Sequence, residues 1–189
     1  YILEPTVFGD SRGYFFESYN KQSFDKLINQ NINFVQDNES FSSRGVLRGL
    51  HGQKDEFAQA KLVRVTQGEV LDVAIDFRKD SPTYLQHFSV KLSSKNKKQL
   101  FIPRGFLHGF VVLSQTAVFN YKCDNWYNKD AEIGIMYNDS DLNIDWLLNE
   151  GELLISDKDL KFHGEGSLFI CETESHIPKA HLHIKKNDP

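Results

Sequence analysis

Residues 45–53, GVLRGLHGQ, contain the pattern that decides the fold. Successive side chains of a β-strand point to opposite faces, so this alternation predicts a strand. One face is expected to carry Leu47, Gly49, His51 and Gln53. A lone histidine in a strand is most often a core residue bonded to a backbone carbonyl. Here a neighbouring arginine, Arg48, favours a barrel interior that holds an anionic ligand and a proton-transfer base.

Similar alternation recurs along the chain between residues 34 and 122. The expected strands cover 14–19, 60–65, 69–77, 87–92, 100–103, 109–113 and 117–122, with Gly, Pro, Asn and Ser between them. Many short strands at regular spacing, with 13% aromatic residues, predict a mainly β sandwich or jelly roll. We expect a short helix over 23–28 with Ser23 as its N-cap. After Asp139, loops and a short helix are expected to pack against the barrel.

Length and composition narrow the class of protein. The 189 residues fit one domain, 1–189, whose polar tail from Pro178 is expected to be mobile. A net charge of -4 gives no basic field for nucleic acid. No apolar run approaches the ~20 residues that a membrane span requires. Two cysteines without metal-ligand spacing, Cys123 and Cys171, fit a reducing cytoplasm.

Four further residues place chemistry on the expected strands, each with a structural alternative. Lys61 shares a face with two valines, so its ammonium either reaches the barrel rim or meets a ligand. Asp72 and its alternate neighbours form either a solvated sheet face or part of a site. The Tyr121 hydroxyl points into the interior or to a backbone carbonyl. His108 lies where a loop enters a strand and offers a second imidazole.

Metal and nucleotide motifs are not found. Metal-binding jelly rolls need two histidines one residue apart plus a glutamate on the same strand, and His51 has no such partner. His181 and His183 have that spacing but lie in the polar tail, which favours surface histidines. The sequence contains no phosphate-binding glycine loop and no Gly-x-Ser-x-Gly elbow. We therefore expect no metal and no organic cofactor.

Five motifs follow one another in a familiar order. They are FGDSRGYFFE at 8–17, QDNES at 36–40, GVLRGLH at 45–51, IPRGFLHGF at 102–110 and SDKD at 156–159. Together they resemble the dTDP-4-dehydrorhamnose 3,5-epimerase family. The resemblance implies a cupin-type jelly roll (a double-stranded β-helix) with a few short helices. It also implies no metal, no cofactor, and a homodimer with exchanged N-terminal strands.

The resemblance assigns roles in proton transfer to four residues. It implies that His51 is the base, that Asp159 orients it, that Lys61 faces the carbonyl oxygen, and that Tyr121 is the acid. A keto sugar carbon is far less acidic than imidazolium, so a fixed cation must stabilise the developing enolate oxygen. A carboxylate beside an imidazole fixes its tautomer. Asp72 is a weaker candidate for the surroundings of the same imidazole.

Other positions resemble the family's substrate contacts. They are Arg12, Phe15, Glu17, Gln36, Asp37, Asn38, Arg48, Asp72, His108, Tyr127, Glu132 and Lys158. Arginine forks suit a diphosphate, and Tyr127 resembles a ring that stacks on the base. The chain departs from the family at Gly52, Trp126 and Tyr137. An aromatic usually follows the catalytic histidine, so Gly52 predicts either free space or flexibility beside the base.

These observations predict an isomerase that inverts carbon 3, carbon 5 or both in a nucleotide-diphospho-4-keto sugar. The first choice of substrate is dTDP-4-keto-6-deoxyglucose, in a cytoplasmic enzyme of lipopolysaccharide or capsule synthesis. One alternative is an epimerase of another sugar nucleotide, such as a GDP-4-keto-heptose. A second is a jelly roll that binds a sugar nucleotide without turnover, which would not need His51, Lys61, Tyr121 and Asp159 together. No nucleic acid or membrane partner is expected.

Overall fold

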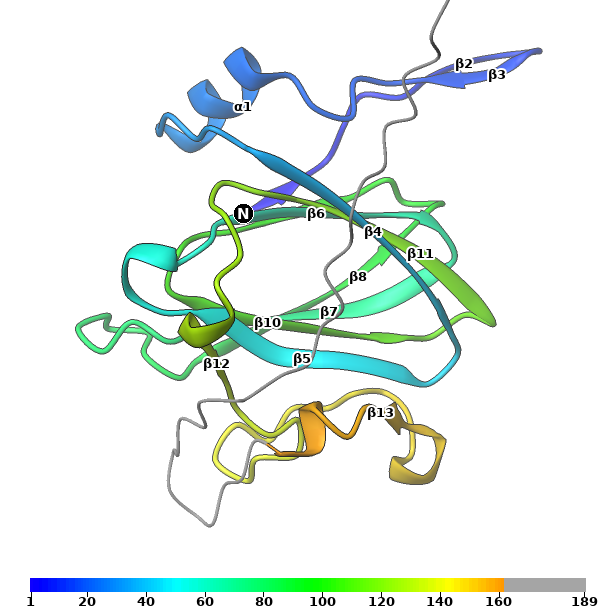
Figure 1. The fold of residues 1–189 in the computed structure, drawn as a ribbon. Coiled ribbons are helices and arrows are strands. Elements are labelled where there is room, and N and C mark those ends of the chain that lie inside the picture. Colours follow the sequence, from blue (N-terminus) through cyan, green and yellow to red (C-terminus); the bar gives the residue numbers. More distant parts are fainter. Residues whose placement is uncertain (162–189) are drawn as a thin grey trace, which may run out of the picture.

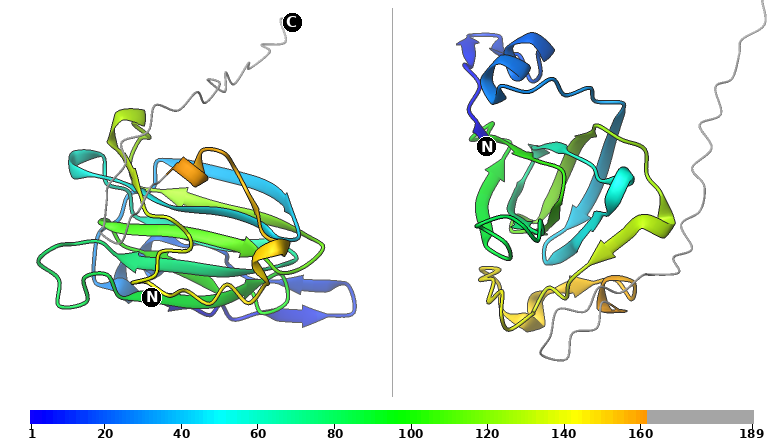
Figure 2. Two further views of the ribbon diagram at one scale, coloured as in Figure 1. Left: turned by 90° about the horizontal axis from the view of Figure 1, so that it is seen from below. Right: turned by 90° about the vertical axis from the view of Figure 1, so that its left-hand side faces the viewer.

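Two β-sheets form the body of the molecule in the computed structural model, which describes residues 1–161 (Figure 1). The first sheet is five-stranded, in the order β1-β9-β6-β11-β4, and the second is six-stranded, in the order β12-β5-β10-β7-β8 with β13 beside β5. Both wrap around a shared core (Figure 2). The jelly roll predicted from the strand pattern is confirmed.

The strand bounds follow the predicted segments to within a few residues. The first sheet contains β1 (Ile2–Leu3), β4 (Gln36–Ser43), β6 (Lys61–Gln67), β9 (Gln99–Ile102) and β11 (Thr116–Cys123). The second contains β5 (Val46–Gln53), β7 (Glu69–Asp76), β8 (His87–Ser93), β10 (Phe106–Val112), β12 (Glu132–Gly134) and β13 (Leu154–Ile155). Because β10 begins at Phe106, His108 lies inside a strand rather than at a loop-to-strand entry.

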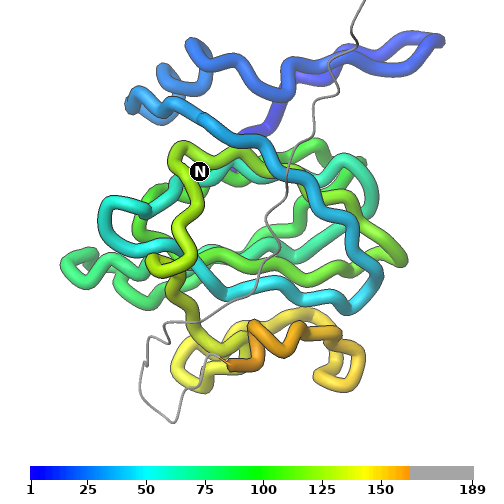
Figure 3. Tube along the Cα trace, viewed as in Figure 1, coloured from blue at the N-terminus to red at the C-terminus, as the bar shows by residue number. Residues whose placement is uncertain are grey.

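The N-terminal part differs from the prediction in two details. The predicted strand over 14–19 is a short hairpin of β2 (Phe8–Asp10) and β3 (Gly13–Phe15). The helix α1 covers Lys21–Ile28, and its N-cap is Asn20, whose side chain accepts a hydrogen bond from the Ser23 amide at 3.2 Å. The predicted cap at Ser23 is therefore wrong, because Asn20 satisfies the first free amides one turn earlier. The hairpin extends away from the barrel (Figure 3).

The C-terminal part covers the outer face of the six-stranded sheet, below β5 in Figure 1. Its short 3-10 turns are η3 (Glu150–Glu152) and η4 (Asp159–Lys161), while η1 (Asp55–Phe57) and η2 (Lys129–Ala131) lie in earlier loops. Ile135, Tyr137, Leu142 and Trp146 pack on strand residues such as Leu50 in one buried cluster. Between residues 140 and 161 no α-helix forms, and 3-10 turns occur where the described chain was expected to hold a short helix.

A second buried cluster fills the space between the sheets. Phe110 of β10 stacks on Phe119 of β11, with ring centroids 4.1 Å apart and planes within 12°. Such a ring pair contributes about 0.5–1.5 kcal/mol beyond its burial. The stack therefore joins the two sheets directly beside the interior positions of His108 and Tyr121.

A β-bulge in β5 changes which residues face the interior. In its pairing with β10, His51 lies opposite His108 and Arg48 lies opposite Phe110, so three steps along β5 match two along β10. Arg48 and His51 therefore share the interior face, whereas Leu47 and Leu50 join the outer cluster. The predicted face of Leu47 with His51 is wrong for this reason.

Gly49 permits this close packing at the bulge. Its φ is +108°, and a Cβ there would lie 2.5 Å from the carbonyl oxygen of His108. Only glycine adopts such a conformation at so short an approach without strain. The glycine in the Arg-Gly-Leu-His pattern is thus a requirement of the bulge.

The alternative of a solvated face for Asp72, Ala74 and Asp76 is wrong. Their exposed fractions are 0%, 6% and 1%. Asp76 forms hydrogen bonds with Arg78, Ser81 and Thr83, and these contacts hold the pKa of its carboxyl well below the usual range despite its burial. Both faces of β7 are covered, so its carboxylates are buried with partners.

Some predictions fall outside the described part of the chain. These are the polar tail from Pro178, the pair His181 and His183, and Cys171. Among residues 1–161, no helix is long and apolar enough to cross a membrane. Within the same range, no group of three or more His, Cys, Asp and Glu side chains is arranged to hold a metal ion.

Candidate active site

His51 lies on the interior face of β5, the strand beside the edge strand β12 of the six-stranded sheet. Burial lowers the pKa of its imidazole, and the nearby cations Lys61 and Lys158 lower it further, while Glu132 acts in the opposite direction. A lowered pKa keeps the ring neutral at physiological pH. A neutral imidazole can accept a proton, so the electrostatics suit a general base.

Lys61 and Tyr121 come from the other sheet. Lys61 begins β6, and its Nζ lies 5.9 Å from the centre of the Tyr121 ring on β11. Burial lowers the pKa of Lys61 and raises that of Tyr121. Among residues 1–161, no side chain forms a hydrogen bond or ion pair with the Lys61 ammonium. A half-buried ammonium that has no carboxylate partner in the described part of the chain is suited to an oxygen that acquires negative charge.

His108 is the second interior imidazole, and it has a buried carboxylate of its own. Its Nε2 lies 3.0 and 3.1 Å from the two carboxylate oxygens of Asp72, and its ring stacks near Phe119. Asp72 is therefore the hydrogen-bond partner of His108. The weaker prediction had instead placed it in the surroundings of His51. The strand register explains this contact. Asp72 on β7 lies opposite Phe110 on β10, and its side chain points to His108, the adjacent interior residue of β10.

Asp159 lies at the start of η4 beneath β5, with 6% of its surface exposed. Burial raises the pKa of its carboxyl, against hydrogen bonds from the Ser156 hydroxyl at 2.9 Å and from the Gly49 amide. Within residues 1–161, no hydrogen bond joins Asp159 to His51. The structure brings the carboxylate to the bulge beside His51, and its role as the orienting partner stays a prediction.

Three predicted substrate contacts are bonded to one another. Glu132 accepts a hydrogen bond from the Tyr127 hydroxyl at 2.7 Å and forms an ion pair with the ammonium of Lys158. These bonds outweigh the effect of burial and lower the pKa of Glu132. The cluster lies next to His51, because Gly134 of the same strand is the register partner of His51.

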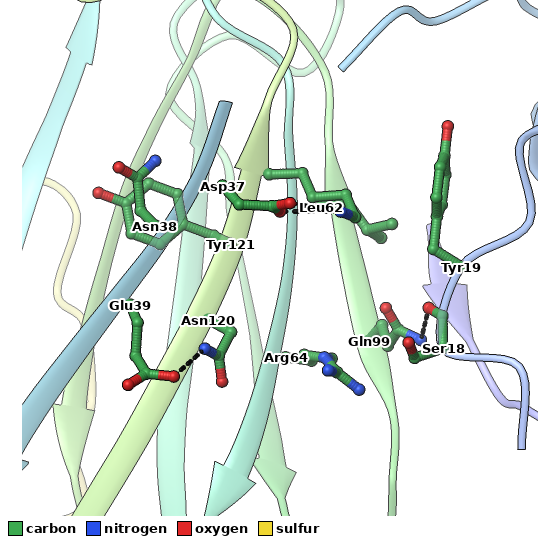
Figure 4. Close-up of a pocket in the computed structure, with 11 residues that line it drawn as sticks. Ser18, Tyr19, Asp37, Asn38, Glu39, Leu62, Arg64, Gln99, Asn120 and Tyr121 are labelled. Carbon is green, nitrogen blue, oxygen red and sulfur yellow. Dashed lines mark hydrogen bonds and ion pairs between the residues drawn. The ribbon is translucent and has the colours of Figure 1, made fainter. Parts of the chain in front are cut away.

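The QDN motif is divided between two faces of β4. Asn38 pairs with Tyr121 toward the interior (Figure 4), and Gln36 donates a hydrogen bond to Asn38 at 2.7 Å. Asp37 faces outward and forms an ion pair with Lys122 at 2.8 Å. It lines a hollow of about 530 Å³ together with Tyr19, and Asn38 and Tyr121 also line this hollow. Strand alternation places the Asp37 side chain on the opposite face of β4 from Asn38, and its role as a substrate contact stays a prediction.

The predicted contacts of the N-terminal segment do not reach this interior within one chain. Arg12 forms an exposed ion pair with Asp10, and Phe15 is 67% exposed on the hairpin. Glu17 accepts a hydrogen bond from Asn20. Arg48, in contrast, shares the interior face of β5, donates to Ser42 at 3.1 Å, and its charge partly offsets the burial that raises the pKa of Tyr121.

Two interior residues were not predicted as part of the site. The side-chain amide of Gln53 donates to the Asn128 carbonyl and accepts from the Asn128 amide, which fixes the loop that carries Tyr127. The sequence feature that could have identified Gln53 as a site residue is its position two residues after His51. Cys123 pairs with Lys61 across the strands, and burial raises the pKa of its thiol to about 11. Nothing in the sequence pattern singles out this cysteine.

The two sheets form a cupin-type jelly roll. Its imidazole on one sheet faces a lysine and a tyrosine on the other, and this arrangement is suited to proton transfer. A family model described as dTDP-4-dehydrorhamnose 3,5-epimerase matches residues 1–164. A protein of that name from Salmonella typhimurium is 57% identical over 145 residues, which cover 77% of this chain and 79% of the relative. The chain belongs to the dTDP-4-dehydrorhamnose 3,5-epimerase family, and it is an isomerase.

Solved structures agree with the sequence comparison. The crystal structure of dTDP-4-dehydrorhamnose 3,5-epimerase from Elizabethkingia anophelis matches with a TM-score of 0.83 and 56% identity, over 85% of this chain and 88% of that chain. A dTDP-6-deoxy-D-glucose-3,5-epimerase from Legionella pneumophila, in complex with dTDP-4-keto-L-rhamnose, matches with a TM-score of 0.81 and 49% identity. That match covers 84% of each chain.

Proposed function

We propose that the chain inverts carbons 3 and 5 of dTDP-4-keto-6-deoxyglucose, without a metal or an organic cofactor. The names of its relatives support this substrate, and the Legionella relative was crystallised with dTDP-4-keto-L-rhamnose, the sugar that inversion at both carbons yields. Relatives of lower identity include a 3'-monoepimerase at 30% identity. The higher identities to 3,5-epimerases favour inversion at both centres.

The observation that carries the mechanism is the division of the site between the two sheets. His51 projects from the six-stranded sheet, whereas Lys61 and Tyr121 project from the five-stranded sheet. Inversion requires a proton to leave one face of the sugar and another to arrive on the opposite face. A sugar held between the sheets would expose one face to the base and the other to the acid.

Each proposed step follows from the state of one group. The neutral His51 imidazole accepts the proton from the carbon beside the carbonyl, and Lys61 stabilises the enolate oxygen as charge develops. Burial raises the pKa of Tyr121, so its hydroxyl is protonated and can donate to the opposite face. Before the second carbon reacts, the imidazolium releases its proton to solvent and the Tyr121 phenolate takes up a proton from solvent.

The observation that favoured a GDP-4-keto-heptose as the substrate was the expected free space at Gly52, and it does not hold. Gly52 was expected to leave space or flexibility beside the base. A Cβ at Gly52 would lie 2.8 Å from the carbonyl oxygen of Phe106 and 3.2 Å from the side chain of Leu107, on the outer face of β5. That position holds no free volume for a larger sugar, and the deoxyhexose stays the first choice.

The proposal also covers the assembly of the protein, its location in the cell and the pathway that it serves. We propose a homodimer in which the projecting hairpin carries Arg12 and Phe15 into the site of the second chain. The exposure of both side chains supports this arrangement, since an apolar strand edge in water favours pairing. The type of substrate supports a cytoplasmic enzyme that supplies a deoxysugar for lipopolysaccharide or capsule.

Proton NMR in deuterated water tests the proposal with three substrates in parallel. We expect deuterium at carbons 3 and 5 of dTDP-4-keto-6-deoxyglucose, with inversion at both. At least a hundredfold higher kcat/KM for a GDP-4-keto-heptose, about 2.7 kcal/mol of discrimination, would overturn the substrate. A dTDP-linked sugar without the keto group controls for background exchange. Binding of the keto sugar without any exchange would indicate a binding module instead.

A further inference from the structure

The loop of residues 124–128, which follows β11, carries two adjacent aromatic side chains at its tip. Trp126 and Tyr127 are 64% and 44% exposed. The residues on both sides of this pair, in contrast, form hydrogen bonds with the body of the protein. Exposed rings on an anchored backbone are suited to binding, because little conformational entropy is lost when a ligand stacks on them.

The side of the loop before the rings is bound to the segment between β5 and β6. The Asn125 side chain donates to the Glu56 carbonyl at 2.8 Å, and the Gln59 side chain donates to the Asn125 carbonyl at 2.8 Å. The Asp124 carboxylate accepts a hydrogen bond from the Ala60 amide at 2.6 Å. Two consecutive loop residues are therefore fixed directly before the first ring.

The side of the loop after the rings is bound by a single side chain, that of Gln53. Its carbonyl oxygen accepts a hydrogen bond from the Asn128 amide at 3.1 Å, and its amide donates to the Asn128 carbonyl. Gln53 is 7% exposed. One buried side chain thus binds both backbone groups of Asn128, as a neighbouring strand would. This double bond places the backbone directly after the Tyr127 ring.

The same strand carries the proposed base. The pairing of β5 with β12 runs without a register shift from His51 to Gln53, so the two side chains share the interior face. Two strand steps separate them by about 6–7 Å along β5. The Tyr127 hydroxyl bond to Glu132 orients the ring, whereas Gln53 ties the backbone of the ring to the strand of the imidazole.

We infer that Gln53 is a positioning residue that holds the Tyr127 ring, the proposed stacking partner of the nucleotide base, at a fixed distance from the His51 imidazole. This inference rests on the proposed function, because it concerns the same site. A nucleotide sugar bound at its base end presents its sugar carbons to His51 only when the two ends of the site match its length. A displacement of about 1 Å in an active site costs up to ~10²-fold in rate. Gln53 acts on the substrate through the Asn128 backbone.

A double-mutant cycle on dTDP binding tests whether Gln53 acts through the ring. The variants are Gln53→Met, Tyr127→Ala and the double variant, with affinities from calorimetry. Loss of a stacking ring weakens binding by roughly 5- to 150-fold, and Gln53→Met is expected to lose at least about threefold of this. In the Tyr127→Ala background, Gln53→Met should cost less than about twofold. Losses that multiply, or no loss while the ring is present, would overturn the inference.

Inorganic pyrophosphate gives a second readout, because it carries the diphosphate without the base. Gln53→Met should leave its affinity within about twofold of the wild type while dTDP binds more weakly. Equal weakening of both ligands would indicate a general distortion of the site and would refute the assigned role. Gln22→Met makes the same chemical change at an exposed position of α1 and is the matched control, for which both affinities should be unchanged.

Should Gln53→Met fail to fold, Gln53→Glu carries the test, because it keeps the size and the acceptor but loses the donor. Protonation of the new carboxyl restores an O–H donor to the Asn128 carbonyl, so dTDP affinity should recover toward the wild-type value as the pH falls. The wild type at each pH accounts for the titration of Glu132, which lies opposite on β12. A ratio of affinities that does not change with pH would contradict the inference.

The binding measurements also separate this inference from the proposed function. A wild-type chain that binds dTDP but does not turn over the keto sugar would refute the proposed function, while the double-mutant cycle would still decide the role of Gln53. A wild-type chain that binds no dTDP would refute both.

Discussion

Lys61 and Tyr121 lie side by side on neighbouring strands of one sheet, with the Lys61 Nζ 5.9 Å from the centre of the Tyr121 ring. The pairing of β6 with β11 produces this proximity, since Val63 is the register partner of Tyr121 and Lys61 lies two residues earlier on the same face. The cation and the hydroxyl therefore approach a sugar from the same side. The base at His51 approaches from the other sheet, and this division leads to four predictions.

His51→Asn is expected to abolish deuterium incorporation at both carbons while dTDP binding is retained. Removal of a general base typically costs ~10²–10⁴-fold in rate. The measurement is proton NMR in deuterated water, with dTDP affinity from calorimetry. His87→Asn, an exposed histidine on β8, is the matched control and should behave as the wild type. A loss of less than about tenfold in His51→Asn would refute the assignment of the base.

Tyr121→Phe should reduce inversion more than it reduces exchange. The base can still remove a proton and return a deuteron to the same face, whereas delivery to the opposite face loses its donor. Parallel integration of the exchanged and the inverted product by NMR gives the ratio. Equal losses of exchange and inversion at both carbons would show that another group is the acid.

The pH dependence of activity should have an acid limit set by a residue of one sheet and an alkaline limit set by a residue of the other. Burial lowers the pKa of His51, so the base stays neutral well below pH 6.5 and activity falls only as the pH drops through that lowered pKa. Burial also lowers the pKa of Lys61 and raises that of Tyr121, so we expect the loss of the Lys61 charge to set the alkaline limit. Lys61→Arg, which stays charged at every accessible pH, should move the alkaline limit upward. An unmoved limit would assign it to Tyr121.

The proposed exchange of hairpins can be tested by mixing two inactive chains. Arg12→Ala removes the hairpin contact and His51→Asn removes the base. If each hairpin enters the partner's site, a mixed dimer contains one site with both native residues. Statistical mixing should then restore about a quarter of the wild-type activity. No recovery after mixing and refolding would place Arg12 in the site of its own chain, and a fully active monomer in light scattering would refute the dimer.

Much of the fold follows from strand alternation, and the differences arise where alternation breaks. The segments 69–77 and 117–122 were predicted almost to their ends, because uninterrupted strands keep a period of two. The bulge at Gly49 adds one residue, so Arg48 rather than Leu47 shares the interior with His51. A period of two cannot reveal an inserted residue, since glycine has no side chain to mark its face.

The sequence predicted which residues form the candidate site more fully than it predicted which of them contact one another. The family resemblance names His108, Asp72 and Glu132, but which carboxylate pairs with which base depends on register between strands far apart in sequence. Asp37 shows how alternation complicates a motif of three consecutive residues. Its side chain points to the opposite face of β4 from Asn38, although both residues line the same hollow, so its predicted contact with the substrate stays a prediction.

The stacked rings of Phe110 and Phe119 connect catalysis to the core. Because the base belongs to one sheet and the acid to the other, the distance between them depends on the separation of the sheets, which this pair of rings helps to set. Folding stability and turnover then depend on the same two side chains. A core substitution there would alter the rate even though neither ring takes part in the reaction. Laboratory evolution toward larger sugars would therefore be expected to select changes at this ring pair as well as in the pocket wall.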